Sequence, residues 1–136
     1  MKTVQGTVIE RATLNVVRDI VSRTSIDSCQ NSSFGGAGAL KISLSGLSYI
    51  IVIDEGVITF FLEVHAPQGG HFDLANEWNM HETVGTAFCL TTGYALKFGV
   101  VAAGGVVRET LHDAVSSFNK AAQKFANKVQ AAHQQA

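Results

Sequence analysis

The sequence predicts a single α+β domain with an antiparallel five-stranded sheet and helices at both ends of the chain. At 136 residues the chain is long enough for one core and too short for two. Hydrophobic residues make up 46% and charged residues 15%, which is typical of a globular chain. Short alternating segments are joined by tight turns, so consecutive strands must be antiparallel. The predicted order is α-β-β-β-α-β-β-α.

The N-terminal part is expected to hold a helix followed by a loop. Thr7 and Glu10 have capping-box spacing, and a helical apolar period continues to about Arg23. Residues 24–38 are polar and rich in Gly and Ser, which predicts a partly mobile loop. The run Gly35-Gly36-Ala37-Gly38 lacks the preceding strand and following helix of a dinucleotide fingerprint, so we interpret it as loop.

Three strands are expected next. Residues 40–44 alternate between apolar and polar, which suits a half-exposed edge strand. Residues 47–53 are nearly all apolar, as in a strand covered on both faces. A tight turn at Asp54-Glu55-Gly56 leads into residues 57–65, which alternate again. One face of this third strand carries Ile58, Phe60, Leu62 and Val64, and the other carries Val57, Thr59, Phe61, Glu63 and His65.

The second half begins with a break at the only proline, Pro67. Asp73 can cap a short helix that runs to about Met80. Two more strands, 84–90 and 94–101, are expected on either side of a Thr-Thr-Gly turn.

The last helix is the clearest element of the sequence. Apolar residues spaced by four and three run from Val107 to Val129 and form one stripe. Lys120, Lys124 and Lys128 lie on the polar side. Cations near a helix C-terminus complement its dipole, and docking of an acidic peptide is the alternative. Residues 131–136 are expected to be a flexible tail.

Two motifs lie in fixed order in this half: Asn76-Glu77-Trp78-Asn79, and Ala103-Gly104-Gly105-Val106 before the last helix. In order and spacing, residues 76–118 resemble the YbjN family of bacterial sensory transduction regulators. The resemblance implies one YbjN-like domain over residues 1–136, with a type III secretion chaperone-like fold. It also implies a protein that is often dimeric and has no known enzymatic activity. Family members often carry arginines where this chain has Met80-His81-Glu82-Thr83, so a function of those charges does not transfer.

The residues of these motifs have physical roles of their own. Trp78 has the area to anchor a helix on a sheet. Asn76 and Asn79 can bond to loop backbone on either side. Gly104 and Gly105 let the chain reverse from strand to helix without a Cβ clash. We therefore expect structural roles for Asn76, Trp78, Asn79, Gly104 and Gly105.

Composition argues against several classes of partner. The net charge of -1 and the pI of about 6.5 give no basic footprint for nucleic acid. No apolar run is long enough to span a bilayer, and the first ten residues lack the apolar core of a secretory signal. We expect a cytoplasmic protein without membrane partners. Cys29 is expected in the loop and Cys89 in the core, with no disulfide.

Candidate chemistry is sparse. His71, Asp73, Glu77 and His81 lie within eleven positions and suggest a metal site. No cysteine joins them and no second histidine lies one turn from the first, so we prefer solvated side chains. The sequence shows no nucleophile elbow and no Cys-His signature. We expect neither a cofactor, nor a metal, nor enzymatic activity.

The sequence therefore predicts a protein-binding regulator or chaperone-like adaptor. Partner segments would bind on an exposed sheet face, or would add a strand at the edge, residues 40–44. A homodimer could use the same face. The candidate binding residues are Val57, Thr59, Phe61, Glu63 and His65. The alternative is a small-molecule sensor with a pocket between sheet and last helix, lined by Phe60, Phe98, Phe118 and Phe125; a filled core is the competing interpretation.

Overall fold

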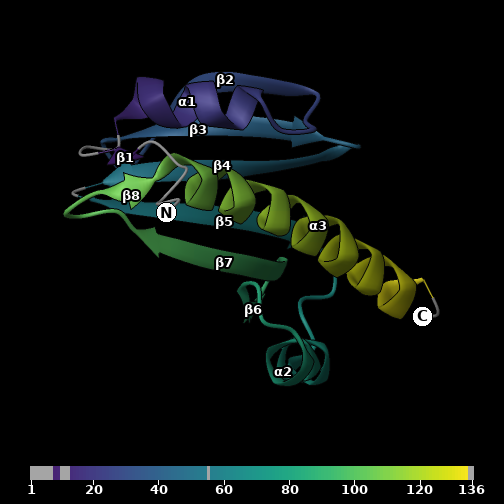
Figure 1. Ribbon diagram of the computed structural model, residues 1–136. Coiled ribbons are helices and arrows are strands. Elements are labelled where there is room, and N and C mark those ends of the chain that lie inside the picture. Colours follow the sequence, from purple (N-terminus) through teal and green to yellow (C-terminus); the bar gives the residue numbers. More distant parts are fainter. Residues whose placement is uncertain (1–7, 10–12, 55, 135–136) are drawn as a thin grey trace.

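The computed structural model describes residues 8–9, 13–54 and 56–134, with side chains described from residue 13 onward (Figure 1). These residues form three helices and a six-stranded antiparallel sheet, which confirms the α+β class. In chain order the elements are β1 (Val8–Ile9), α1 (Leu14–Ser22), β2 (Ser28–Phe34), β3 (Ala37–Leu44), β4 (Leu47–Asp54), β5 (Val57–His65), α2 (Phe72–His81), β6 (Thr86–Leu90), β7 (Gly93–Val101), β8 (Val106–Val107) and α3 (Arg108–His133).

The strands of the main sheet lie in the order β2-β3-β4-β5-β7-β6. The short strands β1 and β8 form a separate pair. Neighbouring strands of the main sheet are joined by hairpins. The exception is the pair β5 and β7, because α2 and β6 lie between these two strands in the chain. The sheet therefore has two edges, β2 and β6.

The prediction of five strands was wrong because the expected loop 24–38 contains β2. This strand pairs with β3 along its whole length, from Ser28 opposite Ser43 to Phe34 opposite Ala37. Gly35 and Gly36, both at positive φ, make the turn. An edge strand that is mostly exposed has no need of apolar alternation, so its sequence looked like a loop. Residues 40–44 consequently lie inside the sheet, between β2 and β4, and not at an edge.

The helices begin at other residues than expected. The predicted capping box at Thr7 and Glu10 lies outside the described residues, and Ile9 belongs to β1. Helix α1 starts after Thr13, whose Oγ1 accepts a hydrogen bond from the Val16 amide at 3.3 Å.

The boundaries of α2 and α3 differ as well. Asp73 does not cap α2: it lies within the first turn, where its charge complements the helix dipole, and His71 occupies the cap position. Helix α3 begins one residue after Val107, which belongs to β8, and continues to His133. Residues 131–133 of the expected flexible tail are therefore helical, while residues 135–136 lie outside the described part.

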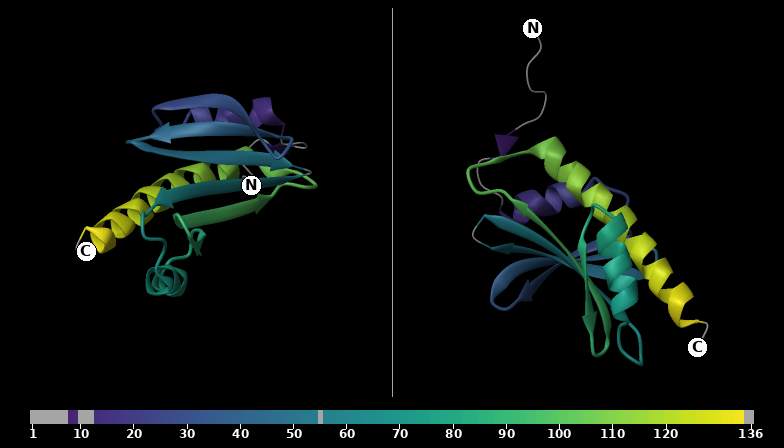
Figure 2. Two further views of the ribbon diagram at one scale, coloured as in Figure 1. Left: turned by 180° about the vertical axis from the view of Figure 1, so that it is seen from behind. Right: turned by 90° about the horizontal axis from the view of Figure 1, so that it is seen from below.

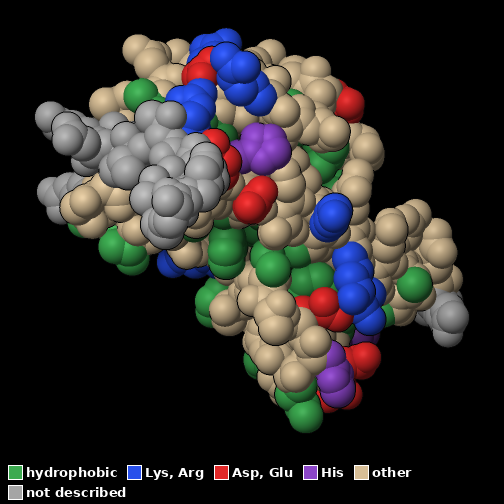
Figure 3. Space-filling view, viewed as in Figure 1, with side chains coloured by type: hydrophobic (Ala, Val, Ile, Leu, Met, Phe, Trp, Pro, Cys, Tyr) green, Lys and Arg blue, Asp and Glu red, His purple; other side chains and the backbone are tan. Residues whose placement is uncertain are grey.

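Helices α1 and α3 cover one face of the sheet, which we call the inner face (Figures 1 and 2). The apolar stripe of α3 is buried there as predicted, with Leu111, Val115, Phe118, Ala122, Phe125 and Val129 in the core. The even-numbered side chains of β5, from Ile58 to Leu62, face the same core and are buried. Helix α2 packs beside β6 and against α3. Over α1 and α3 the surface carries charged side chains of both signs (Figure 3).

None of the described helices is both long and apolar enough to cross a bilayer.

Candidate protein-binding surface

The face of the sheet opposite α1 and α3 is not covered by any described helix (Figure 2). We call it the outer surface. It consists of the alternate side chains of the strands that point away from the core. The members that matter here are Phe34, Ala37, Val52, Asp54, Val57, Thr59, Phe61, Glu63, His65, Phe88, Lys97 and Val101. An antiparallel sheet packed on one side commonly leaves the other side to solvent or to a partner.

All five candidate binding residues lie on the outer surface, along β5. Val57 is 39% exposed, Thr59 and Phe61 are half-buried, and Glu63 and His65 are exposed. The alternation of the strand therefore gave their common face correctly.

Part of this face forms an open hollow of about 640 Å³. We call it the outer hollow, and its lining residues are Phe34, Gly35, Ala37, Val52, Asp54, Val57, Thr59, Phe61 and Lys97. The Phe34 ring is 52% exposed and leans across two strands, so that its centroid lies 6.3 Å from that of Phe61. The outer hollow thus combines two aromatic rings with aliphatic side chains of three different strands.

The structure brings Val57, Thr59 and Phe61 together in the outer hollow, whereas Glu63 and His65 lie further along β5 and do not line it. Sequence reasoning missed Phe34, because it placed this residue in a loop. A signal was present, since two Gly residues between short segments are typical of a hairpin.

Two charges of opposite sign border the outer hollow. Asp54 lies at the end of β4, and Lys97 stands opposite Phe61 in β7. Both are exposed, and neither forms a salt bridge with another described residue. An apolar floor with one free anion and one free cation can hold an apolar group and orient the polar groups beside it.

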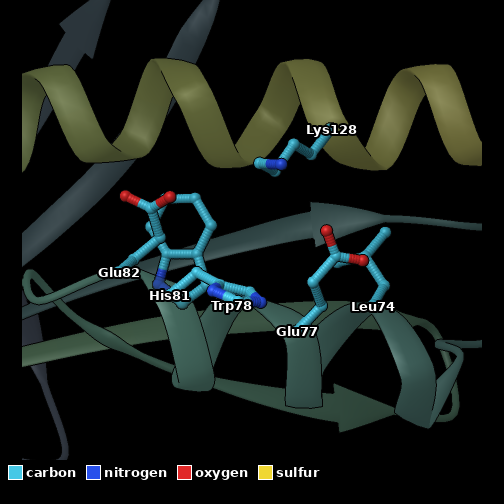
Figure 4. A pocket seen from close by; sticks show the side chains of 6 residues that line it. All are labelled: Leu74, Glu77, Trp78, His81, Glu82 and Lys128. Atoms are coloured by element: carbon cyan, nitrogen blue, oxygen red, sulfur yellow. The ribbon is translucent and has the colours of Figure 1, made fainter.

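A second, smaller cavity of about 200 Å³ lies between α2 and α3 (Figure 4). Its lining residues are Leu74, Glu77, Trp78, His81, Glu82 and Lys128. Trp78 is 2% exposed, donates from Nε1 to the Gly85 carbonyl at 3.3 Å, and meets Phe125 edge-on with centroids 5.1 Å apart. These contacts are those of the expected core anchor. Lys124 pairs with Glu82 at 2.7 Å, so this lysine holds α2 against α3.

The histidine and acid residues do not converge on one point. His81 borders the cavity between the helices, His71 and Asp73 border a different pocket at the other end of α2, and Glu77 borders both. Among the described residues no three His, Cys, Asp or Glu side chains are placed to share a metal ion.

The motif asparagines lie on α2, where Asn76 is exposed. Asn79 donates from Nδ2 to the Ala87 carbonyl at 3.1 Å, and its Oδ1 accepts from the Ala87 amide at 2.7 Å. The side-chain amide of Asn79 therefore forms with the Ala87 backbone the two hydrogen bonds that a neighbouring strand would form. Gly104 and Gly105 have φ of 86° and 107° and turn the chain from β7 towards β8.

The four aromatic residues expected to line a sensor pocket pack into the core. The Phe118 ring lies 5.2 Å from Phe60 and 6.3 Å from Phe98, centroid to centroid. Phe60, Phe118 and Phe125 are fully buried, and Phe98 is half-buried against them. A ligand between sheet and α3 would have to push these rings apart.

Neither cysteine is suited to nucleophilic chemistry. Cys29 lies in β2 and not in a loop, and both Cys29 and Cys89 are half-buried free thiols. Burial raises the pKa of both thiols above the ordinary value, and the charge of Arg18 opposes this only in part for Cys29.

Comparisons of the chain with models of known protein families, with curated proteins and with solved structures found no match. The resemblance of residues 76–118 to the YbjN family therefore stays a prediction, and so does the chaperone-like fold.

Proposed function

We propose that this chain is a non-enzymatic, protein-binding regulator or chaperone-like adaptor that binds partner segments on its outer surface. The observation that supports this most is the outer hollow, where Phe34 and Phe61 face each other on an uncovered sheet. The resemblance to the YbjN regulators is a second, weaker support.

The apolar content of the outer hollow favours a partner with an apolar side chain. Burial of one Leu-, Ile- or Phe-sized side chain contributes about 1.5–3 kcal/mol. Exposed apolar surface extends beyond the hollow to Val101, which is 73% exposed. Contiguous exposed apolar surface of this kind marks interaction sites in folded proteins.

The openness of the outer hollow favours a protein segment over a small molecule. Small-molecule sites usually enclose most of the ligand surface. Here the floor is a sheet face, and Phe34 alone rises over it from the β2–β3 hairpin. An extended segment can lie across such a face, pack an apolar side chain against the two rings, and present a cation to Asp54 and an anion to Lys97.

The test is the substitution Phe61→Asp, with Phe88→Asp as its matched control. Phe88 is also on the outer surface and is 44% exposed, but it does not line the outer hollow. Each protein is used as bait in host extract, and captured proteins are identified by mass spectrometry. We expect proteins that bind wild type and Phe88→Asp and are lost with Phe61→Asp.

Circular dichroism and thermal unfolding of all three proteins establish that they are folded. Identical capture by Phe61→Asp and wild type would contradict the proposal. Loss of capture with both variants would instead extend the binding site over the outer surface from the outer hollow to β6.

A further inference from the structure

The two edges of the sheet differ in how they are protected. At β6 the Asn79 side chain occupies both backbone groups of Ala87, and α2 packs along the strand. A further strand cannot pair with Ala87 unless this helix moves away. The β6 edge is therefore closed.

In the part of the chain that the structure describes, the β2 edge carries none of the usual protections of an edge strand. Natural edge strands avoid unwanted pairing through charged residues, proline, bulges or very short length. Strand β2 is seven residues long, contains neither a charged residue nor proline, and pairs with β3 without a skipped residue. Its sequence is Ser-Cys-Gln-Asn-Ser-Ser-Phe.

Arg18 of α1 is the one described side chain that bonds to the backbone of β2. Its Nη2 lies 3.4 Å from the Cys29 carbonyl, and its Nη1 lies 2.5 Å from the Asn31 Oδ1. The first contact is long for a hydrogen bond. It engages a single carbonyl and leaves the rest of the strand free to pair.

We propose that a second copy of this chain pairs with this edge, β2 against β2 in antiparallel direction, and joins the two six-stranded sheets into one. The register that pairs all seven residues places Asn31 opposite the second copy's Asn31. It also places Gln30 opposite Ser32 and Ser28 opposite Phe34. No like charges meet, because the strand has no charged residue.

Because the β6 edge is closed, self-association through the sheet edges ends at a closed pair. Pairing of β2 with β6 of the next molecule would repeat without end and build a filament. Asn79 and α2 block that arrangement, whereas pairing of β2 with β2 uses up both open edges. The two-fold axis is perpendicular to the sheet, so both outer hollows face the same side and stay accessible.

The joint is small. It contains the seven residues of β2 and the flank of α1, which lies over β2 and β3 (Figure 1). Interfaces below about 1,200 Å² are usually weak. We therefore expect a dimer that dissociates on dilution to about micromolar concentration.

The experiment uses single cysteines in the full chain with Cys29→Ser and Cys89→Ser. Asn31→Cys is compared with Ser28→Cys, which is exposed on the same strand. In the proposed register the two Cβ atoms at position 31 lie about 5 Å apart. At position 28 they lie about 20 Å apart, because six residues of rise separate them. A short thiol cross-linker should join Asn31→Cys into a dimer at least tenfold more efficiently than Ser28→Cys.

Sedimentation of the wild-type protein supplies the second measurement. A concentration-dependent dimer together with preferential cross-linking at position 31 supports the interface between the two β2 strands. A monomer at every concentration overturns it, and so does a dimer that cross-links equally at both positions. Phe61→Asp separates this proposal from the proposed function, because it should leave the dimer intact. Loss of the dimer in Phe61→Asp would place the dimer interface on the outer surface and overturn the β2 pairing.

Discussion

Phe60 and Phe61 are neighbours in β5, yet they serve opposite faces of the sheet. The Phe60 ring is fully buried and lies within 6.4 Å of the rings of Tyr49, Phe98 and Phe118, centroid to centroid. The Phe61 ring is half-buried and meets Phe34, which is itself half in solvent. The same residue type thus fills the core on one side and leaves apolar surface unfilled on the other. Stability should depend on the inner face, and binding on the outer surface.

The largest expected effect is that of Phe118→Ala on the inner face. Phe118 is fully buried in α3 and contacts the rings of Tyr49, Phe60 and Phe98. Removal of a buried Phe ring costs about 3–5 kcal/mol of unfolding free energy, because a cavity remains. Denaturant unfolding measures this. A loss below about 1 kcal/mol would show that the aromatic cluster is loosely packed, and the contrast between the faces would disappear.

An intermediate effect is expected for Tyr49→Phe. The Tyr49 hydroxyl donates to Asn119 Oδ1 at 2.5 Å, and Asn119 is only 8% exposed. Loss of the hydroxyl leaves this oxygen buried without its donor, at a cost of about 1–3 kcal/mol. The double variant Tyr49→Phe/Asn119→Leu should recover part of the loss. Failure to recover would mean that the cost has another origin.

The pH dependence of unfolding offers a control for the same contact. Burial, with a smaller contribution from the charge of Cys29, raises the pKa of Tyr49 above the ordinary tyrosine value. The unfolded chain therefore ionises first, at about pH 10. The contribution of the protonated Tyr49 to the unfolding free energy is complete below that pH. As the pH rises further, it falls by about 1.4 kcal/mol for each pH unit until Tyr49 of the folded protein also ionises. Tyr49→Phe should remove this decrease of the unfolding free energy with pH.

The smallest effect on stability is expected for Phe34→Ala. Phe34 is 52% exposed and contacts the partly open ring of Phe61. We expect a loss of no more than about 1 kcal/mol, since little apolar area leaves the interior. Partner capture should nevertheless fall as it does with Phe61→Asp. Retained capture would restrict the binding site to β4, β5 and β7.

Regular periodicity made part of this fold predictable. The stripe of α3 and the alternation of β5 gave the correct faces, because each residue there is buried or exposed according to its position in the repeat. The same alternation places Val57, Thr59 and Phe61 on one side of the sheet.

Other features depend on contacts between distant residues. Strand β2 is polar apart from Cys29 and Phe34, and only its ladder with β3 makes it a strand. The position of Phe34 over Phe61, and hence the outer hollow, follows from that ladder. The capping-box spacing pointed to Thr7, whereas Thr13 is the residue that caps α1. The pairing of Asn79 with Ala87 likewise leaves no local pattern.

The buried pair of Tyr49 and Asn119 has a consequence for how α3 finds its place. The core residues Leu111, Phe118 and Phe125 repeat every seven positions, and so do Val115, Ala122 and Val129. A helix displaced along its axis by one such repeat would offer the sheet nearly the same hydrocarbon. In the direction that brings Ala126 to the place of Asn119, the displacement would also leave the Tyr49 hydroxyl without an acceptor, which makes the slipped arrangement less stable by about 1–3 kcal/mol. One polar contact thus distinguishes between alignments of α3 that would be nearly equal in stability by apolar packing alone.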